Sequence, residues 1–149
     1  MKDWKKEIDA IIKESLKSKD MVRANVVRML KADLTNDEIR NKTDLTEEQV
    51  LQVIQRAVKK RKESIDEFKK AGKEDRVQEE ENELKYLAAF LPEQVSEEEL
   101  ARVVEETIKE LNPSGMKDFG KVMSAVMQKV KGRADGKMVN ESVRKKLPQ

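Results

Sequence analysis

The sequence contains neither cysteine nor histidine, and aromatic residues make up only 3% of its 149 residues. Without cysteine there is no disulfide framework, and without both residues thiol nucleophiles, Ser-His triads and Cys/His zinc sites are excluded. The groups left for catalysis are carboxylates, lysines, hydroxyls and Tyr86, and no glycine-rich phosphate-binding loop is present. We therefore expect no independent enzyme activity, no cofactor and no metal.

Long hydrophobic runs are also missing. No apolar stretch approaches the about 20 residues needed to span a bilayer, and the N-terminus lacks the apolar segment of a signal peptide. Charged residues make up 42% of the chain and hydrophobic residues 37%. This composition predicts a soluble helical protein without a membrane partner, and the absence of cysteine suits a cytoplasmic location.

The small net charge of +2 hides a strong segregation along the chain. Residues 1–73 carry a net charge of +5, residues 74–110 carry −9, and residues 111–149 carry +6 with nine basic and three acidic side chains. A basic C-terminal part indicates a polyanion-binding tail, although neutralisation within the molecule would produce the same pattern.

Apolar residues recur at helical spacing through almost the whole chain, which predicts an all-α protein of about seven helices. Pro92 interrupts this pattern, because the residue before a proline is pushed out of the helical region. We predict an N-terminal helical domain of about four helices at 1–91 and a C-terminal three-helix domain at 96–149. The boundary lies at 92–95, with Pro92 as the hinge.

Local residues predict where individual helices start and stop. Asp20 suits the N-cap of the second helix, and the polar segment 35–44 is expected to end that helix. Capping boxes at Thr46 and Ser96 start the third and fifth helices, while Gly72 stops the third.

Two runs of like charge fall within these helices. The four basic residues Lys59–Lys62 either grip phosphates or form a solvated surface, and we favour the solvated surface. The acidic run at Glu79, Glu80, Glu81 and Glu83 is also expected to be a solvated face, with Lys85 as its neighbour.

The segment 116–139 is the most informative part of the sequence. Its apolar residues share one helical face, its basic residues lie opposite, and a tight basic turn follows. Within that turn Gly132 suits a left-handed C-cap, Asp135 suits the N-cap of the last helix, and Gly136 helps to shape the turn. The apolar set is Phe119, Met123, Val126 and Val130, and the opposite set is Lys117, Lys121, Ser124, Gln128 and Lys131.

Gly120 lies inside this sixth helix, where glycine costs about 1 kcal/mol relative to alanine. Either close helix packing or the close approach of a ligand backbone must compensate for that cost. We favour packing.

Three segments together resemble the YqeY family over the whole chain: Ala88–Gln94, Asp118–Met123 and Lys131–Lys137. The Lys-Gly-Arg-Ala-Asp-Gly turn is the most specific of them. The C-terminal domain of this family resembles the tail domain of the B subunit of the tRNA-dependent amidotransferase. That carbon–nitrogen ligase amidates mischarged tRNA with glutamine as the nitrogen donor, and its tail helps to hold the tRNA.

The resemblance implies an all-helical two-domain protein with affinity for tRNA and contact with the amidotransferase or aminoacyl-tRNA machinery. It does not imply the transferase reaction, because the catalytic portion has no counterpart here. The functional hypothesis is that Lys117, Lys121, Lys131, Arg133 and Lys137 contact an RNA backbone. The alternative is that the lysines provide solubility and the glycines shape the turn, in which case the protein is a protein–protein adaptor.

Overall fold

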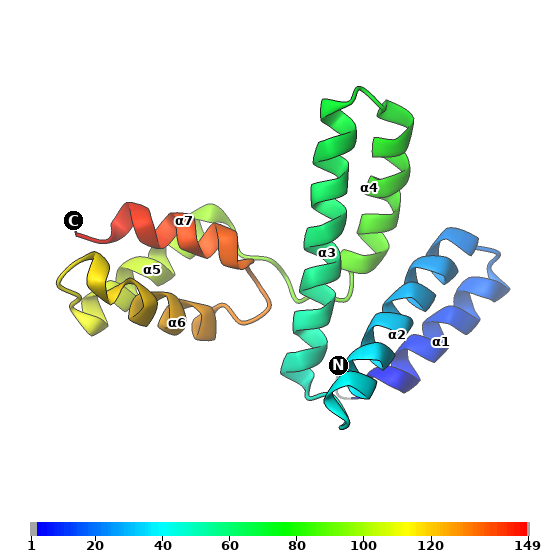
Figure 1. Cartoon of the computed structure of the whole chain (residues 1–149), viewed down its shortest axis with the longest axis horizontal. Coiled ribbons are helices and arrows are strands. Elements are labelled where there is room, and N and C mark those ends of the chain that lie inside the picture. Colours follow the sequence, from blue (N-terminus) through cyan, green and yellow to red (C-terminus); the bar gives the residue numbers. More distant parts are fainter. Residues whose placement is uncertain (1–2, 149) are drawn as a thin grey trace. The chain divides into compact units, whose positions relative to one another are not determined.

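The computed structural model describes residues 3–148. The helices form two compact units, one ending at Leu91 and the other beginning at Pro92. The division of the chain into domains at 1–91 and 96–149 stays a prediction. Within the described range there are seven α-helices, one short 3-10 helix and no strand, which confirms the predicted all-α fold (Figure 1): α1 (Trp4–Lys17), α2 (Met21–Asn41), α3 (Glu47–Lys70), α4 (Glu74–Ala88), α5 (Glu97–Leu111), η1 (Met116–Asp118), α6 (Phe119–Lys129) and α7 (Gly136–Lys146).

The N-terminal unit consists of two helical hairpins, α1–α2 and α3–α4, whose paired helices lie side by side in Figure 1. α2 packs against all three other helices of the unit. Its residues Val27, Leu30 and Leu34 are at most 1% exposed and share a core with Ile8 of α1 and Ile54 of α3. Burial of apolar surface on α2 therefore holds the two hairpins together.

The helix boundaries confirm several of the predicted caps. The Asp20 carboxylate accepts a hydrogen bond from the backbone N–H of Arg23 at 3.1 Å. Thr46 and Gln49 exchange both bonds of a capping box, at 3.2 and 2.9 Å. Gly72 follows α3 with a φ of +69°, a left-handed conformation that glycine adopts without steric cost.

The segment 35–44 ends α2 as predicted, and the last helical residue is Asn41. Asp37 pairs with Arg40 in the same helix at 3.5 Å and with Arg56 of α3 at 2.8 Å. The polar residues in this segment reflect contacts with a neighbouring helix and solvent, and polarity alone does not break a helix.

The C-terminal unit is a bundle in which α5, α6 and α7 each contact the other two. At the end of α5, the hydroxyl of the fully buried Thr107 donates to the carbonyl of Val103 at 2.7 Å, so this polar group is satisfied inside the bundle. The centre of the unit is formed by seven aliphatic side chains that are at most 1% exposed: Leu100, Val104, Val122, Val126, Val130, Val139 and Val143.

The sixth helix is shorter than the sequence predicted. The residues Met116–Asp118 form a 3-10 turn, and α6 begins at Phe119. Of the residues expected on the outer face of this helix, Lys117 lies in the 3-10 turn and Lys131 lies beyond the helix end at Lys129.

Candidate nucleic-acid interface

The turn between α6 and α7 is hydrogen-bonded to the segment that opens the C-terminal unit. The backbone N–H of Val95 donates to the Arg133 carbonyl at 2.8 Å, and Gln94 Nε2 donates to the Gly132 carbonyl at 3.0 Å. Gln94 Nε2 also donates to the carbonyl of Pro92, the predicted hinge, at 2.8 Å. Gly132 is buried with a φ of +73°, the left-handed conformation that the sequence predicts for it. The basic turn therefore has a fixed place in the unit.

Arg133 is only partly exposed, and its guanidinium is bonded within the unit, whereas the RNA-binding hypothesis needs it to be available to a phosphate. Its Nε donates to the Glu93 carbonyl at 2.9 Å, and its Nη2 donates to the Glu99 carboxylate at 3.1 Å. The Arg133 side chain is 36% exposed and the Glu99 side chain 37%. The guanidinium therefore already joins the turn to two other parts of the unit.

The sequence did not reveal that Glu93 and Glu99 are the hydrogen-bond partners of Arg133. Glu99 occupies the third position of α5, where the predicted capping box would direct its carboxylate back to the Ser96 backbone. The Ser96 side chain does accept from the Glu99 backbone N–H at 3.1 Å, but the Glu99 carboxylate is bonded to Arg133. Because these partners are separated by 34 positions along the chain, no local pattern could have found the pair.

The other two turn residues belong to the start of α7. Asp135 is its N-cap, and its carboxylate accepts from the backbone N–H of Met138 at 2.8 Å. Gly136 is the first residue of the helix, and its φ is not positive. Of the glycines in this turn, Gly132 is thus the one that requires glycine's conformational freedom.

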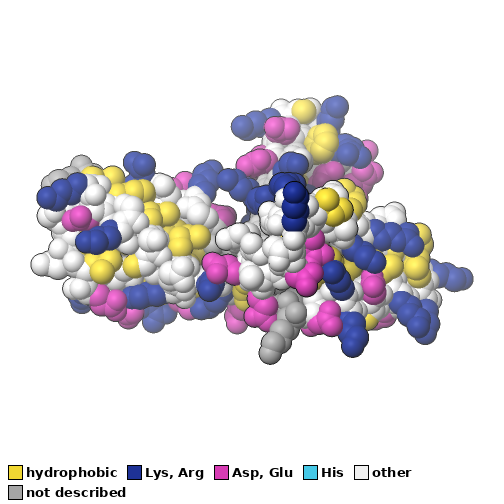
Figure 2. All heavy atoms as spheres, turned by 60° about the horizontal axis from the view of Figure 1, so that its bottom comes forward, with side chains coloured by type: hydrophobic (Ala, Val, Ile, Leu, Met, Phe, Trp, Pro, Cys, Tyr) yellow, Lys and Arg dark blue, Asp and Glu magenta, His cyan; other side chains and the backbone are white. Residues whose placement is uncertain are grey.

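The four lysines of the predicted interface are exposed. Lys117 lies in η1, Lys121 in α6, Lys131 in the turn and Lys137 in α7. Figure 2 shows lysine and arginine side chains distributed over the visible face of the C-terminal unit, with hydrophobic and acidic side chains between them. On this face the basic side chains are therefore dispersed, and no continuous basic strip is seen.

Glutamates of α5 neutralise part of the basic charge of the C-terminal unit. Lys129 pairs with Glu110 at 2.9 Å and Lys146 with Glu105 at 2.6 Å. The hydrogen bond and the charge of Lys146 lower the pKa of the Glu105 carboxyl. The sequence left two explanations for the segregated charge open, a polyanion-binding tail or neutralisation within the molecule. Neutralisation applies to Lys129 and Lys146, whose charges are paired.

Asp118 is an acidic group next to the exposed lysines. Its carboxylate accepts from the backbone N–H of Ser114 at 2.9 Å and from the Ser114 hydroxyl at 3.1 Å. These bonds, followed by the charges of Lys117 and Lys121, lower the pKa of Asp118. The carboxylate closes the turn before η1 and fixes where the two lysines emerge.

The interpretation of Gly120 as a packing position is wrong. Gly120 is exposed and is the second residue of α6, and its φ is not positive. Apart from its chain neighbours and the backbone of its own helix, a Cβ atom added there would meet no atom of the described residues within 4 Å. The cost of glycine in a helix, up to about 1 kcal/mol relative to alanine, is therefore not offset by packing.

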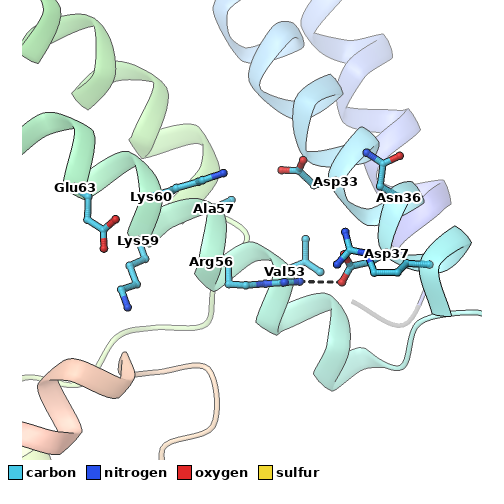
Figure 3. A pocket seen from close by; sticks show the side chains of 10 residues that line it. Asp33, Asn36, Asp37, Val53, Arg56, Ala57, Lys59, Lys60 and Glu63 are labelled. Carbon is cyan, nitrogen blue, oxygen red and sulfur yellow. Dashed lines mark hydrogen bonds and ion pairs between the residues drawn. The ribbon is translucent and has the colours of Figure 1, made fainter.

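The basic run of α3 is divided between two environments. Arg61 is half-buried and pairs with Glu80 of α4 at 3.0 Å and with Glu83, whereas Lys59, Lys60 and Lys62 are exposed. Lys59 and Lys60 border an open pocket of about 440 Å³ between α2 and α3 (Figure 3). Its walls carry both signs of charge: Asp33, Asp37, Arg40, Arg56 and Glu63 also line it.

The acidic residues of α4 form ion pairs with Arg61, Lys69 and Arg76. The sequence predicted Lys85 as their neighbour. Glu79 accepts from Arg76 at 2.8 Å, and Glu81 lies 3.7 Å from the ammonium of Lys69. Lys85 instead lies over the ring of Tyr86, 4.9 Å from its centroid. The Lys69–Glu81 pair and the Arg61 pairs connect α3 to α4, whereas the Arg76–Glu79 pair lies within α4.

Tyr86 is hydrogen-bonded to the residue that caps α2. Its hydroxyl donates to the Asp20 carboxylate at 2.9 Å, the same carboxylate that caps α2. This bond raises the pKa of Tyr86, and the backbone N–H of Arg23 together with the Tyr86 hydroxyl lowers the pKa of Asp20. A raised pKa keeps the phenol protonated, which is the opposite of what an activated tyrosine base requires.

The fold and these contacts define a small all-helical protein with a three-helix unit that presents dispersed lysines. A family model described as Yqey-like protein matches residues 5–147, so the chain belongs to the YqeY family. The family predicted from the sequence is thereby confirmed.

Similar proteins fall into two groups. A fungal protein named "Altered inheritance of mitochondria protein 41, mitochondrial", from Pyrenophora tritici-repentis, is 30% identical over 91% of this chain and 76% of its own length. The E component of an archaeal glutamyl-tRNA(Gln) amidotransferase is 39% identical in Thermococcus sibiricus and 41% identical in Methanocaldococcus jannaschii, each over 59 residues. That match covers 37% of this chain but only 9% of the archaeal protein. The similar amidotransferase proteins are thus E subunits, whereas the resemblance described from the sequence is to the tail domain of the B subunit.

Among the helices of residues 3–148, none combines the length and the hydrophobicity that crossing a membrane requires. In the same range there is no group of three or more acidic side chains arranged to hold a metal ion.

Proposed function

We propose that this chain is an RNA-binding accessory protein, related to the tail of the tRNA-dependent amidotransferase, that binds tRNA or another structured RNA. The observation that carries the proposal is geometric. Lys117, Lys121 and Lys137 are exposed in the same unit in which three other basic residues are paired with glutamates of α5. Exposed lysines act as mobile point charges that suit phosphate.

The relatives support RNA as the ligand class. The archaeal proteins carry glutamyl-tRNA(Gln) in their name, and their matched 59 residues are close in length to the C-terminal unit. Structured RNA is recognised largely through shape and phosphate, so lysines on a helical unit are adequate. With 3% aromatic residues the chain is poorly suited to stacking unpaired bases.

The proposal covers binding and not the ligase reaction, because the chain matches only 9% of the archaeal amidotransferase protein. Action alongside the amidotransferase or the aminoacyl-tRNA machinery is part of the proposal. The cytoplasmic location stays a prediction, since the fungal relative is named as mitochondrial.

The test is the affinity of the purified full chain for tRNA at low salt, measured by fluorescence anisotropy. The variant Lys117→Ala/Lys121→Ala/Lys137→Ala removes the proposed contacts. A matched control, Lys13→Ala/Lys17→Ala/Lys62→Ala, removes three exposed lysines of the N-terminal unit and changes the net charge equally. We expect the first variant to weaken binding by about tenfold or more and the control to leave it nearly unchanged.

Equal binding by both variants and the wild type would contradict the proposal. The lysines would then serve solubility, and the adaptor function would be the better account.

A further inference from the structure

Gly120 is a position in α6 where the helix backbone is not covered by a side chain, and exposed lysines lie near it in the chain. Lys117 precedes it by three residues and Lys121 follows it directly, and all three positions are exposed. Lys117 lies in the 3-10 turn that leads directly into α6, and Lys121 lies in the first turn of α6. Val122 and Val126, on the opposite side of α6, are fully buried. Gly120 therefore faces away from the core of the unit, in a stretch of chain that carries two exposed cations.

The fold gives no reason for glycine at this position. Apart from its chain neighbours and the backbone of its own helix, a Cβ atom would meet nothing within 4 Å, and the backbone does not adopt the left-handed conformation that favours glycine. Gly132, by contrast, is buried in a left-handed turn. What glycine does provide at position 120 is room, because a partner can approach the helix backbone more closely when no side chain intervenes.

We propose that Gly120 is the point of closest approach between α6 and the sugar–phosphate backbone of a bound RNA. This inference rests on the proposed function and adds a steric requirement to it. With the RNA backbone against Gly120, its phosphates lie within reach of Lys117 and Lys121. Contact then requires both the charges of the lysines and the absence of a side chain between them.

The experiment separates these two requirements with a size series, Gly120→Ala and Gly120→Leu, in the full chain. Because both residues favour helix and the space is open, thermal stability should stay the same or rise by about 2–4 °C. Affinity for tRNA should nevertheless fall, on the order of threefold for alanine and tenfold for leucine, because an added side chain acts as a clash. The dependence of affinity on salt should stay that of the wild type, since no charge is removed.

A matched control is Ala10→Leu, which adds a leucine to an exposed helical position of the N-terminal unit and should leave tRNA affinity unchanged. If the wild type binds tRNA and both Gly120 variants bind equally well, the inference is wrong while the proposed function stands. A loss of thermal stability in Gly120→Ala would also overturn it, because glycine would then be required by the fold. If the wild type itself does not bind tRNA, it is the proposed function that fails.

Discussion

Arg133 connects three parts of the C-terminal unit through one side chain. Its guanidinium bonds the Glu93 carbonyl and the Glu99 carboxylate, while its own carbonyl accepts from Val95. The fork of donors on arginine allows one group to serve two acceptors, which a lysine ammonium cannot do with the same geometry. A loss of RNA binding on replacing Arg133 would therefore report on the fold as well as on any phosphate contact.

Replacing Arg133 by alanine should lower the free energy of unfolding by about 1–2 kcal/mol, because charge-assisted hydrogen bonds are lost from a partly exposed site. Arg133→Lys should fall between the wild type and alanine, since it keeps the charge but not both bonds. Lys121→Ala, at an exposed position of α6, should change stability by no more than about 0.5 kcal/mol. Urea denaturation followed by circular dichroism measures all three. Equal stability of Arg133→Ala and Lys121→Ala would show that the observed bonds do not stabilise the unit.

The sequence identified the residues of the basic turn but could not predict the direction of every side chain. Helical periodicity sufficed for Lys121, because the outer face of an amphipathic helix follows from the spacing of its apolar residues. Arg133 lies in an irregular turn, where the direction of the side chain depends on partners far along the chain. The same limit applies to Gly120, since whether space near it is filled is a tertiary property.

Asp118 should make the stability of the protein dependent on pH in acid. Its pKa is lowered in the folded state by the N–H and the hydroxyl of Ser114 and by the charges of Lys117 and Lys121. The stabilisation is therefore fully present above its ordinary pKa of 3.8 and is lost as the pH falls through the lower folded value. Asp118→Asn removes this titration, so its stability should fall less steeply than that of the wild type below pH 3.8.

Urea midpoints measured at a series of pH values test this prediction. Parallel curves for the wild type and Asp118→Asn across the acid range would mean that the Ser114 bonds do not favour the charged carboxylate.

At the scale of elements, the sequence located the ends of α3 more sharply than the end of α2. Thr46 and Gly72 bound α3 as predicted, because their effects are local to the chain. α2 also has apolar residues on its outer surface, such as Met29 at 59% exposed and Ile39 at 69%. This helix is not cleanly amphipathic, so the sequence could place its end only within the segment 35–44, and the structure puts it at Asn41.

The end of α2 offers a test of these boundary rules. Lys42 caps the helix in a left-handed conformation with a φ of +56°, which is unfavourable for a residue with a side chain. Lys42→Gly should therefore raise the free energy of unfolding by about 0.5–1 kcal/mol. Lys62→Gly, in the middle of α3, removes the same charge and should lower it by about 1 kcal/mol. Chemical denaturation of the two variants checks the opposite signs, and destabilisation by both would contradict the assignment of the cap.

At the scale of the whole molecule, the segregation of charge along the sequence is partly cancelled by the fold. Acidic residues of α4 pair with Arg61 and Lys69 of α3, and acidic residues of α5 pair with Lys129, Arg133 and Lys146. The net charge of +6 for residues 111–149 therefore overstates the basic charge that a ligand meets. The account of function depends instead on the exposed lysines of the C-terminal unit and on membership of the YqeY family.

The most direct test of that account is the salt dependence of tRNA binding by the full chain. If Lys117, Lys121 and Lys137 each neutralise one phosphate, the logarithm of affinity should fall linearly with the logarithm of salt concentration. Replacing all three by alanine should reduce this slope by about two to three units, by analogy with duplex DNA. The variant should remain folded, because the three side chains are exposed. A folded triple variant with the affinity and salt slope of the wild type would contradict the central claim that these lysines bind RNA.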